Sequence, residues 1–187
     1  MRVICGIFVL AVVVFSCNKP KNPSLCANNS QCVLPPLPPG NKYQHIDIAT
    51  GKTTPSELVS FARSLKGVPY KYGSTNPEQG FDCSGFVTCV FNHFGIMVPR
   101  PSVDFTFVNQ SIDIKAAKPG DLILFTGSDS IPRIAGHIGI IVSNQKDDLI
   151  FIHATSRHNY GVTETPLTLY YQQRYIKTIR VFAQNGR

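Results

Sequence analysis

A cysteine lies where a glycine-rich turn meets an amphipathic helix, in the segment 81–87, which reads Phe-Asp-Cys-Ser-Gly-Phe-Val. The first-turn N–H groups of a helix and its dipole favour negative charge, so we expect the thiol of Cys83 to lose its proton more easily than a free cysteine. The thiolate is the nucleophilic form of this side chain. Cys83 is therefore predicted to be a catalytic nucleophile.

Two histidines downstream lie on runs that are typical of β-strands. His137 stands in Gly-His-Ile-Gly-Ile-Ile-Val and His153 in Phe-Ile-His-Ala-Thr-Ser. A nucleophilic thiol needs a neighbour that takes its proton and later protonates the leaving amine. That imidazole needs a second group to fix its tautomer. We interpret His137 as the base and acid, and His153 as the orienting group.

Acyl transfer also requires hydrogen-bond donors for the developing oxyanion. The backbone N–H groups of Cys83 and Ser84 are the natural donors, and the hydroxyl of Tyr70 is a further candidate. Taken singly, each candidate has an ordinary interpretation as a buried cysteine, a strand-end or core histidine, or a surface tyrosine. Together with their flanking sequence they favour catalysis.

Two helices should hold the first half of this arrangement. Thr-Pro-Ser-Glu at 54–57 is a capping box with proline at the first helical position, which predicts a helix to about Lys66 that stops at Gly67. A second helix is predicted over 83–94, with Asp82 as its N-cap and Gly95 beyond its end.

The second half of the chain changes to strand patterns. Ser102 is expected to cap a short third helix through Val108. Apolar or alternating runs then predict strands over 121–126, 137–143, 149–155 and 177–183, with a short helix within 166–174. Helices followed by strands indicate an α+β fold in which N-terminal helices pack on an antiparallel sheet.

The N-terminus has the layout of an export signal. Residues 3–15 form an uncharged apolar stretch that is too short to span a bilayer, and it ends at Ser16-Cys17. This end resembles the lipobox of bacterial lipoproteins, which implies a signal peptide over 1–16 and a lipid on Cys17. An ordinary signal peptide and an uncleaved anchor are the alternatives. Either way, we expect the protein to leave the cytoplasm.

The residues that follow are rich in Pro, Asn, Lys and Ser. We interpret 17–53 as a lipid-anchored linker, partly in polyproline conformation, and 54–187 as one catalytic domain. An ordered extension packed on the domain is the alternative for this linker. The location expected from these segments is the bacterial cell envelope, on a membrane and facing the periplasm or the cell exterior.

Charge and cysteine content limit the partners. The formal net charge is +7, and removal of 1–16 takes away one basic residue, Arg2, and leaves +6. A cationic surface suits a polyanionic wall or acidic lipid headgroups, although net charge alone does not define a specific site. No interleaved aromatic and basic pattern argues for nucleic acid. The spacing of Cys26 and Cys32 permits a loop disulfide and leaves their pairing open.

A structural metal is not expected. Cys83 and Cys89 should lie roughly 120° apart around their helix, so they and His93 do not form a metal site. Cys89 is expected to pack as a small buried apolar side chain.

From about residue 54 to its end, the chain resembles the NlpC-type family of bacterial cell-wall cysteine peptidases, a branch of the papain-like superfamily. The matching segments stand in the family's order and are Gly-Val-Pro-Tyr-Lys-Tyr-Gly at 67–73, Gly-Phe-Asp-Cys-Ser-Gly-Phe-Val at 80–87, Pro-Arg-Pro-Ser at 99–102, Pro-Gly-Asp-Leu-Ile-Leu-Phe at 119–125, Gly-His-Ile-Gly-Ile at 136–140 and Ile-His-Ala-Thr-Ser at 152–156.

The resemblance implies a papain-like fold and cleavage of peptidoglycan stem peptides, commonly between D-γ-glutamate and a diamino acid, through a thioester acyl-enzyme. It gives Cys83 as nucleophile, His137 as base and acid, and His153 as orienter. The substrate-binding residues that it implies are Tyr70, Asp82, Ser84 and Ser102; Asp82 and Ser84 match positions that bind the free amino end of the stem in some members. At a position where the family often has glutamine, this chain has Phe105.

Two other functions stay open from the sequence. An amidase or acyltransferase would use the same Cys-His pair on another bond, and a catalytically silent wall-binding protein would keep the fold without the reaction. We expect a monomer that requires no metal and no organic cofactor.

Overall fold

The computed structural model describes residues 46–108, 111–127, 134–145, 148–157 and 160–186. Within these ranges the helices are α1 (Pro55–Ser64), α2 (Cys83–His93) and α3 (Leu169–Arg174), with 3₁₀ helices at Ser102–Phe107, Ile114–Ala116 and Ala183–Gly186. The strands are β1 (Ser111–Ile112), β2 (Leu122–Thr126), β3 (Ala135–Gln145), β4 (Asp148–Thr155), β5 (Gly161–Pro166) and β6 (Tyr175–Ile179).

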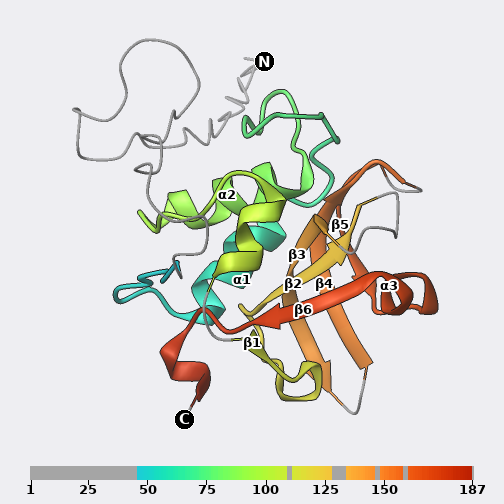
Figure 1. Cartoon of the computed structure of the whole chain (residues 1–187). Coiled ribbons are helices and arrows are strands. Elements are labelled where there is room, and N and C mark those ends of the chain that lie inside the picture. Colours follow the sequence, from blue (N-terminus) through green and yellow to red (C-terminus); the bar gives the residue numbers. More distant parts are fainter. Residues whose placement is uncertain (1–45, 109–110, 128–133, 146–147, 158–159, 187) are drawn as a thin grey trace, which may run out of the picture.

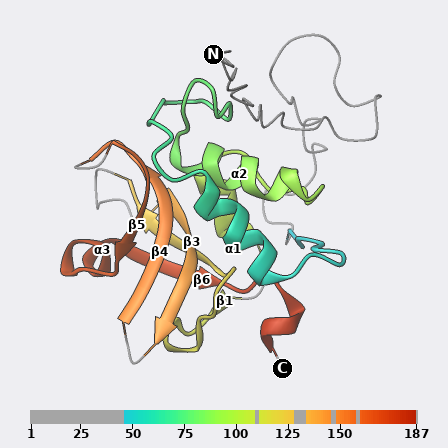
Figure 2. The same ribbon diagram turned by 180° about the vertical axis from the view of Figure 1, so that it is seen from behind.

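The strands form one six-stranded sheet in the order β1-β6-β2-β3-β4-β5. Every neighbouring pair in it is antiparallel. The helices α1 and α2 lie together on one side of the sheet, and α3 lies on the other (Figures 1 and 2). The α+β fold with N-terminal helices packed on an antiparallel sheet is confirmed.

Alternation along the strands divides the core into two apolar clusters. Ile138, Ile140 and Ile152 belong to the cluster that includes the buried residues of α1 and α2. Their neighbours Ile141 and Phe151 belong to a second cluster, which includes Tyr171 of α3. Because successive side chains of a strand point to opposite faces, His137 and His153 project on the side of α3.

The capping box before α1 is present as predicted. The Thr54 N–H donates to the Glu57 carboxylate at 2.8 Å, and the Glu57 N–H donates to the Thr54 hydroxyl at 3.3 Å. These bonds satisfy two of the N–H groups that a helix start leaves without a partner. The helix ends at Ser64, slightly earlier than the sequence indicates.

Helix α2 agrees with its prediction to within a residue, and Asp82 caps it by accepting from the Gly85 N–H at 2.5 Å. Gly85 is required by packing. A Cβ at this position would lie 2.0 Å from the Ser74 carbonyl oxygen, closer than any real contact. The turn that carries Ser74 therefore packs directly on the first turn of α2.

The other boundaries differ from the sequence analysis in several places. The segment after Pro101 is a 3₁₀ helix, and Ser102 is its first residue and not its cap. β3 starts two residues before His137, and the last strand ends at Ile179, with a 3₁₀ helix from Ala183 in place of its predicted end. β1 and β5 were not expected. β5 was missed because its Val-Thr-Glu-Thr core has few apolar residues, and the packing of β4 defines it instead.

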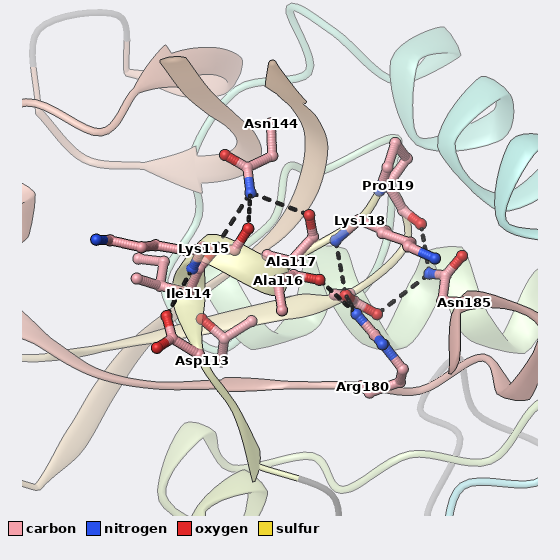
Figure 3. A network of polar contacts seen from close by, with 12 residues as sticks. Asp113, Ile114, Lys115, Ala116, Ala117, Lys118, Pro119, Asn144, Arg180 and Asn185 are labelled. Carbon is pink, nitrogen blue, oxygen red and sulfur yellow. Dashed lines mark hydrogen bonds and ion pairs between the residues drawn. The ribbon is translucent and has the colours of Figure 1, made fainter. Parts of the chain in front are cut away.

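A polar network supports the turn that enters β2 (Figure 3). The side-chain amide of Asn144 donates to three carbonyls of the turn 114–117, at 3.0 to 3.4 Å. Asp121, which is fully buried, accepts from Arg180 at 3.1 Å and from Asn185 at 3.2 Å. The aspartate of the Pro-Gly-Asp segment thus has a structural role, because it joins the start of β2 to the C-terminal residues.

The predictions for Cys17, Cys26 and Cys32, and most of the predicted linker, concern residues outside the described ranges. Among the residues that the structure does describe, no helix combines the length and the apolar character that crossing a membrane requires.

Candidate active site

Cys83 is the first residue of α2 and is 8% exposed. Its sulfur lies 3.5 Å from the Ser102 hydroxyl and donates to the Gly136 carbonyl at 3.8 Å. The backbone N–H of Ile138 also faces the sulfur. The sulfur therefore lies against the backbone on both sides of His137, the predicted base.

The thiol of Cys83 does not have the lowered pKa that the sequence analysis predicts. Burial raises its pKa, and the negative charge of Asp82 adds to the increase. Hydrogen bonds from the Ser102 hydroxyl and from the backbone N–H groups of Ser84 and Ile138 act in the opposite direction and are smaller in effect. The prediction was wrong because it counted the helix terminus and left out the loss of hydration.

His137 and His153 are in direct contact. His137 Nε2 lies 2.7 Å from His153 Nδ1, and His153 Nε2 lies 3.0 Å from the Thr165 hydroxyl oxygen. With Nε2 of His137 used in this way, Nδ1 is the other ring nitrogen that can take up a proton. The predicted orienter therefore holds the predicted base.

Both rings are held in neutral form. Burial lowers the pKa of His137 to about 4, and the positive charge of Arg174 contributes. Burial also holds the pKa of His153, which is fully buried, well below its usual value. The rings of Phe151 and Tyr171 pack on His153 at centroid distances of 4.7 and 5.6 Å. At neutral pH both rings are therefore uncharged, and His137 can accept a proton without first losing one.

Tyr70 reaches the same place from another segment. Its backbone pairs with Phe81, two residues before Cys83, and its N–H donates to the Tyr160 carbonyl at 3.3 Å. Burial, followed by the negative charges of Cys83 and Asp82, raises the pKa of Tyr70 to about 12. The hydroxyl of this half-buried side chain therefore stays protonated and available as a donor near the sulfur.

Asp82 and Ser84 have internal partners. Two nitrogens of Arg100 donate to the two Asp82 oxygens at 3.0 and 2.8 Å, and Arg100 also donates to the Ser84 hydroxyl at 2.7 Å. The Gly73 N–H donates to Asp82 at 2.8 Å. These contacts give Asp82 a cap and an ion pair. Binding of a substrate amine by Asp82 or Ser84 stays a prediction and would require one of these contacts to be shared.

Ser102 and Phe105 lie in the same 3₁₀ helix but have different surroundings. Ser102 is partly exposed and contacts the sulfur, which places it beside any group that reacts there. Phe105 is fully buried in the cluster shared with α1 and α2. The residue that replaces the family's glutamine therefore contributes to the core.

Three residues of the site were not assigned a role from the sequence. Arg100 stands in the recognised Pro-Arg-Pro-Ser segment, where a charged residue between prolines was the only signal. Arg174 donates to the carbonyls of Thr126 and Gly127 beside the start of β3. Thr165 lies on the strand that was missed, so no local pattern could bring it to His153.

Cys83, Cys89 and His93, which were not expected to bind a metal, lie apart on α2. Cys83 begins α2, whereas His93 ends it and stacks on Phe61 at a centroid distance of 3.6 Å. Cys89 is partly buried at the edge of the core, not fully buried as predicted. Among the described residues, no group of three or more His, Cys, Asp or Glu side chains is placed to hold a metal ion.

Comparisons with known proteins identify the family of the chain. The sequence model of the NlpC/P60 family matches residues 67–180. The gamma-DL-glutamyl hydrolase of Bacillus subtilis is 28% identical over 137 residues, which cover 73% of this chain and 32% of that protein. The bifunctional muramidase/DL-endopeptidase CwlT of the same organism is 41% identical over 87 residues, which cover 46% of this chain and 26% of that protein.

The fold is also found among solved structures. The crystal structure of an NlpC/P60 family protein from Bacillus cereus has a TM-score of 0.61 and 26% identity, over 71% of this chain and 41% of that one. The match with the curated relatives spans only about a third or less of their lengths. Since the family model covers more than half of the residues and the fold agrees, the chain belongs to the NlpC/P60 family.

Proposed function

We propose that this protein is a cysteine endopeptidase that hydrolyses peptidoglycan stem peptides at the bond between D-γ-glutamate and the diamino acid. The observation that carries the proposal is the convergence of Cys83, His137 and His153, with the two rings 2.7 Å apart and the sulfur against the backbone around His137. The names of the relatives, a gamma-DL-glutamyl hydrolase and a DL-endopeptidase, support the class of bond.

The first half of the reaction starts from a neutral thiol and a neutral imidazole. The sulfur exchanges its hydrogen bond to Gly136 for one to Nδ1 of His137, which takes the proton as the sulfur bonds to the substrate carbonyl carbon. The carbon–nitrogen bond then breaks, and His137 gives the proton to the leaving amine. The products of this half are a thioester on Cys83 and a free amine.

The second half uses water. His137 takes a proton from the water as its oxygen attacks the thioester carbon, and it returns this proton to the sulfur as the carbon–sulfur bond breaks. In both halves negative charge develops on the carbonyl oxygen. The first-turn N–H groups of α2 and the hydroxyl of Tyr70, whose raised pKa keeps it protonated, are the donors proposed for that oxygen.

We place this activity in the cell envelope. Residues 1–16 would be removed as a signal peptide, a lipid on Cys17 would hold the protein on a membrane, and 17–45 would act as the linker. The predicted linker is shortened from 17–53 because Ile46 and Ile48 pack against the core of the domain. The net charge of +6 after Arg2 is lost favours approach to a polyanionic wall. We propose a monomer, because the three side chains of the proposed site all come from one chain.

Mass spectrometry of defined stem peptides tests the reaction. Peptides with meso-diaminopimelate or lysine at the third position are incubated with wild type, with Cys83→Ala and with Cys89→Ala, the control on the same helix. We expect cleavage after D-γ-glutamate by wild type and Cys89→Ala, and none by Cys83→Ala. A muropeptide, in which the stem is attached to its sugar, is the second substrate, and release of the whole stem from it would instead show an amidase. Wall binding without cleavage by wild type would show a silent binding protein.

A further inference from the structure

The contact between the two histidines continues to a third polar group. His153 uses Nδ1 toward His137 at 2.7 Å and Nε2 toward the Thr165 hydroxyl at 3.0 Å. His153 is fully buried, so neither of its nitrogens has water as an alternative partner. The three side chains form one line of hydrogen bonds that leads away from Cys83.

Strand register produces this line. In the β4–β5 pair, His153 lies opposite Thr163, and Phe151 lies opposite Thr165. Thr165 is therefore the diagonal neighbour of His153 on the same face of the sheet, within reach of a long side chain. Phe151 and Tyr171 pack against the His153 ring and restrict its rotation.

Protonation of His137 fixes the direction of every hydrogen bond in the line. An imidazolium has N–H groups on both nitrogens, so Nε2 of His137 must donate to Nδ1 of His153. The proton of neutral His153 is then on Nε2, and the Thr165 oxygen must accept it. When both rings are neutral, the reverse direction is also satisfied, because the hydroxyl can donate. In that reversed state Nδ1 of His137 already holds a proton and cannot take one from Cys83.

The charges around the rings make the Thr165 oxygen important. Arg174, from α3, faces His137 with a positive charge, which opposes protonation of the ring. Tyr171, from the same helix, is neutral because burial raises the pKa of its hydroxyl. In the described part of the chain, the hydrogen-bond partners of the two rings include no carboxylate. The imidazolium is therefore stabilised through His153 and Thr165.

We infer that Thr165 is a positioning residue for the reaction, which selects the productive tautomer of His153 and stabilises the His137 imidazolium as the thiol attacks. The inference rests on the proposed function. The hydroxyl stabilises the charged state more than the neutral one, since only the charged state requires it to accept. Such an interaction stabilises the transition state more than the bound substrate, so it accelerates the chemical step.

Two substitutions at this position test the inference. Thr165→Val keeps the shape and removes the hydroxyl, and we expect a loss of about tenfold in kcat/KM, at the upper end of the range for a hydrogen bond between neutral groups. Thr165→Ser keeps the oxygen, and we expect activity within about threefold of wild type. Thr178→Val is the matched control, because it removes a buried threonine hydroxyl that bonds Tyr175 at 3.2 Å, elsewhere in the same sheet.

The pH profile separates positioning from a structural effect. Loss of the acceptor disfavours the imidazolium and lowers the pKa of His137 further. The limb of the profile that reports this ring should then move to lower pH, by about one unit for a tenfold effect. A disturbed fold would lower the rate at every pH without moving the limb. Thermal unfolding checks that the variants fold, and Thr165→Ala replaces the valine variant if it does not.

The rate of Cys83 alkylation by iodoacetamide, measured against pH, gives a readout that needs no substrate. We expect slower alkylation of Thr165→Val at neutral pH, because the imidazolium that accompanies the thiolate is less stable. If wild type cleaves no stem peptide, the proposed function fails, and alkylation still decides the role of Thr165. A wild-type pH dependence in Thr165→Val, or an equal loss in Thr165→Ser, would overturn the inference.

Discussion

The ion pair between Arg100 and Asp82 allows a quantitative prediction about the start of α2. Arg100→Gln removes a charge that donates to both oxygens of Asp82, at 3.0 and 2.8 Å, and to Ser84 at 2.7 Å. Asp82 then keeps its cap on Gly85 but has lost its counter-charge. Asp82→Asn is the complementary change, because asparagine is an equally good N-cap and is neutral.

The expected cost follows from the burial of the two partners. Removing one partner of a fully buried pair costs about 3 to 5 kcal/mol, whereas an exposed pair contributes less than about 1 kcal/mol. The side chains of Arg100 and Asp82 are 29% and 12% exposed, which is between these limits. We therefore expect Arg100→Gln to cost about 2 kcal/mol of unfolding free energy. For a domain of this size, that lowers Tm by about 6 to 10 °C.

A double-mutant cycle measured by urea unfolding isolates the pair. The double variant Asp82→Asn/Arg100→Gln should lose less stability than the two single variants added together, with a coupling of about 2 kcal/mol. Arg100→Lys, which keeps the charge and loses the two-pronged contact, should fall between wild type and Arg100→Gln. Additive single effects, with a coupling under about 0.5 kcal/mol, would refute this account of how the helix start is held.

Three further outcomes follow from the structure. Gly85→Ala should destabilise the domain by about 2 kcal/mol or more, because the added Cβ would overlap the Ser74 carbonyl, and this outweighs the helix preference of alanine. An unchanged Tm would show that the turn that carries Ser74 can move. Glu164→Gln should cost under about 1 kcal/mol, and less at high salt, because its ion pairs with Arg63 and Lys66 are partly exposed. Urea unfolding at two salt concentrations measures this. The free energy of unfolding should fall by about 3 kcal/mol as pH drops from 6.5 toward 4, because His137 takes up a proton in the unfolded chain but stays neutral in the folded chain down to its pKa of about 4. His153 adds to this loss in the same direction. Urea midpoints that stay constant over this pH range would contradict the neutral assignment.

Features of the site that depend on short stretches of chain could be predicted from the sequence. The caps at Thr54 and Asp82 are local, since each hydrogen bond joins residues three apart, and both helices were predicted to within a few residues. The placement of Cys83 at the start of α2 follows from the Asp82 cap. The approach of His137 to His153 was predicted from the order of the strands together with the resemblance to a family.

Features that depend on packing between distant segments could not be predicted. The contact of His153 with Thr165 requires the β4–β5 register, and β5 has too few apolar residues to be recognised on its own. The pairing of Arg100 with Asp82 joins residues 18 positions apart through a turn with no repeating pattern. The direction of the pKa shift of Cys83 was mispredicted for a similar reason, because burial is a property of the whole fold and the sequence shows only the helix terminus.

Burial of this site has a consequence for catalysis. It raises the pKa of the Cys83 thiol and lowers the pKa of His137, so the thiolate–imidazolium pair is disfavoured while no substrate is bound. The pair must then form during the attack itself, when negative charge moves from the sulfur to the carbonyl oxygen. At that stage the helix N–H groups and Tyr70 can stabilise the anion, and His153 can stabilise the cation. Stabilisation that acts only when the charges appear lowers the barrier, whereas a preformed ion pair would already have lowered the energy of the resting state.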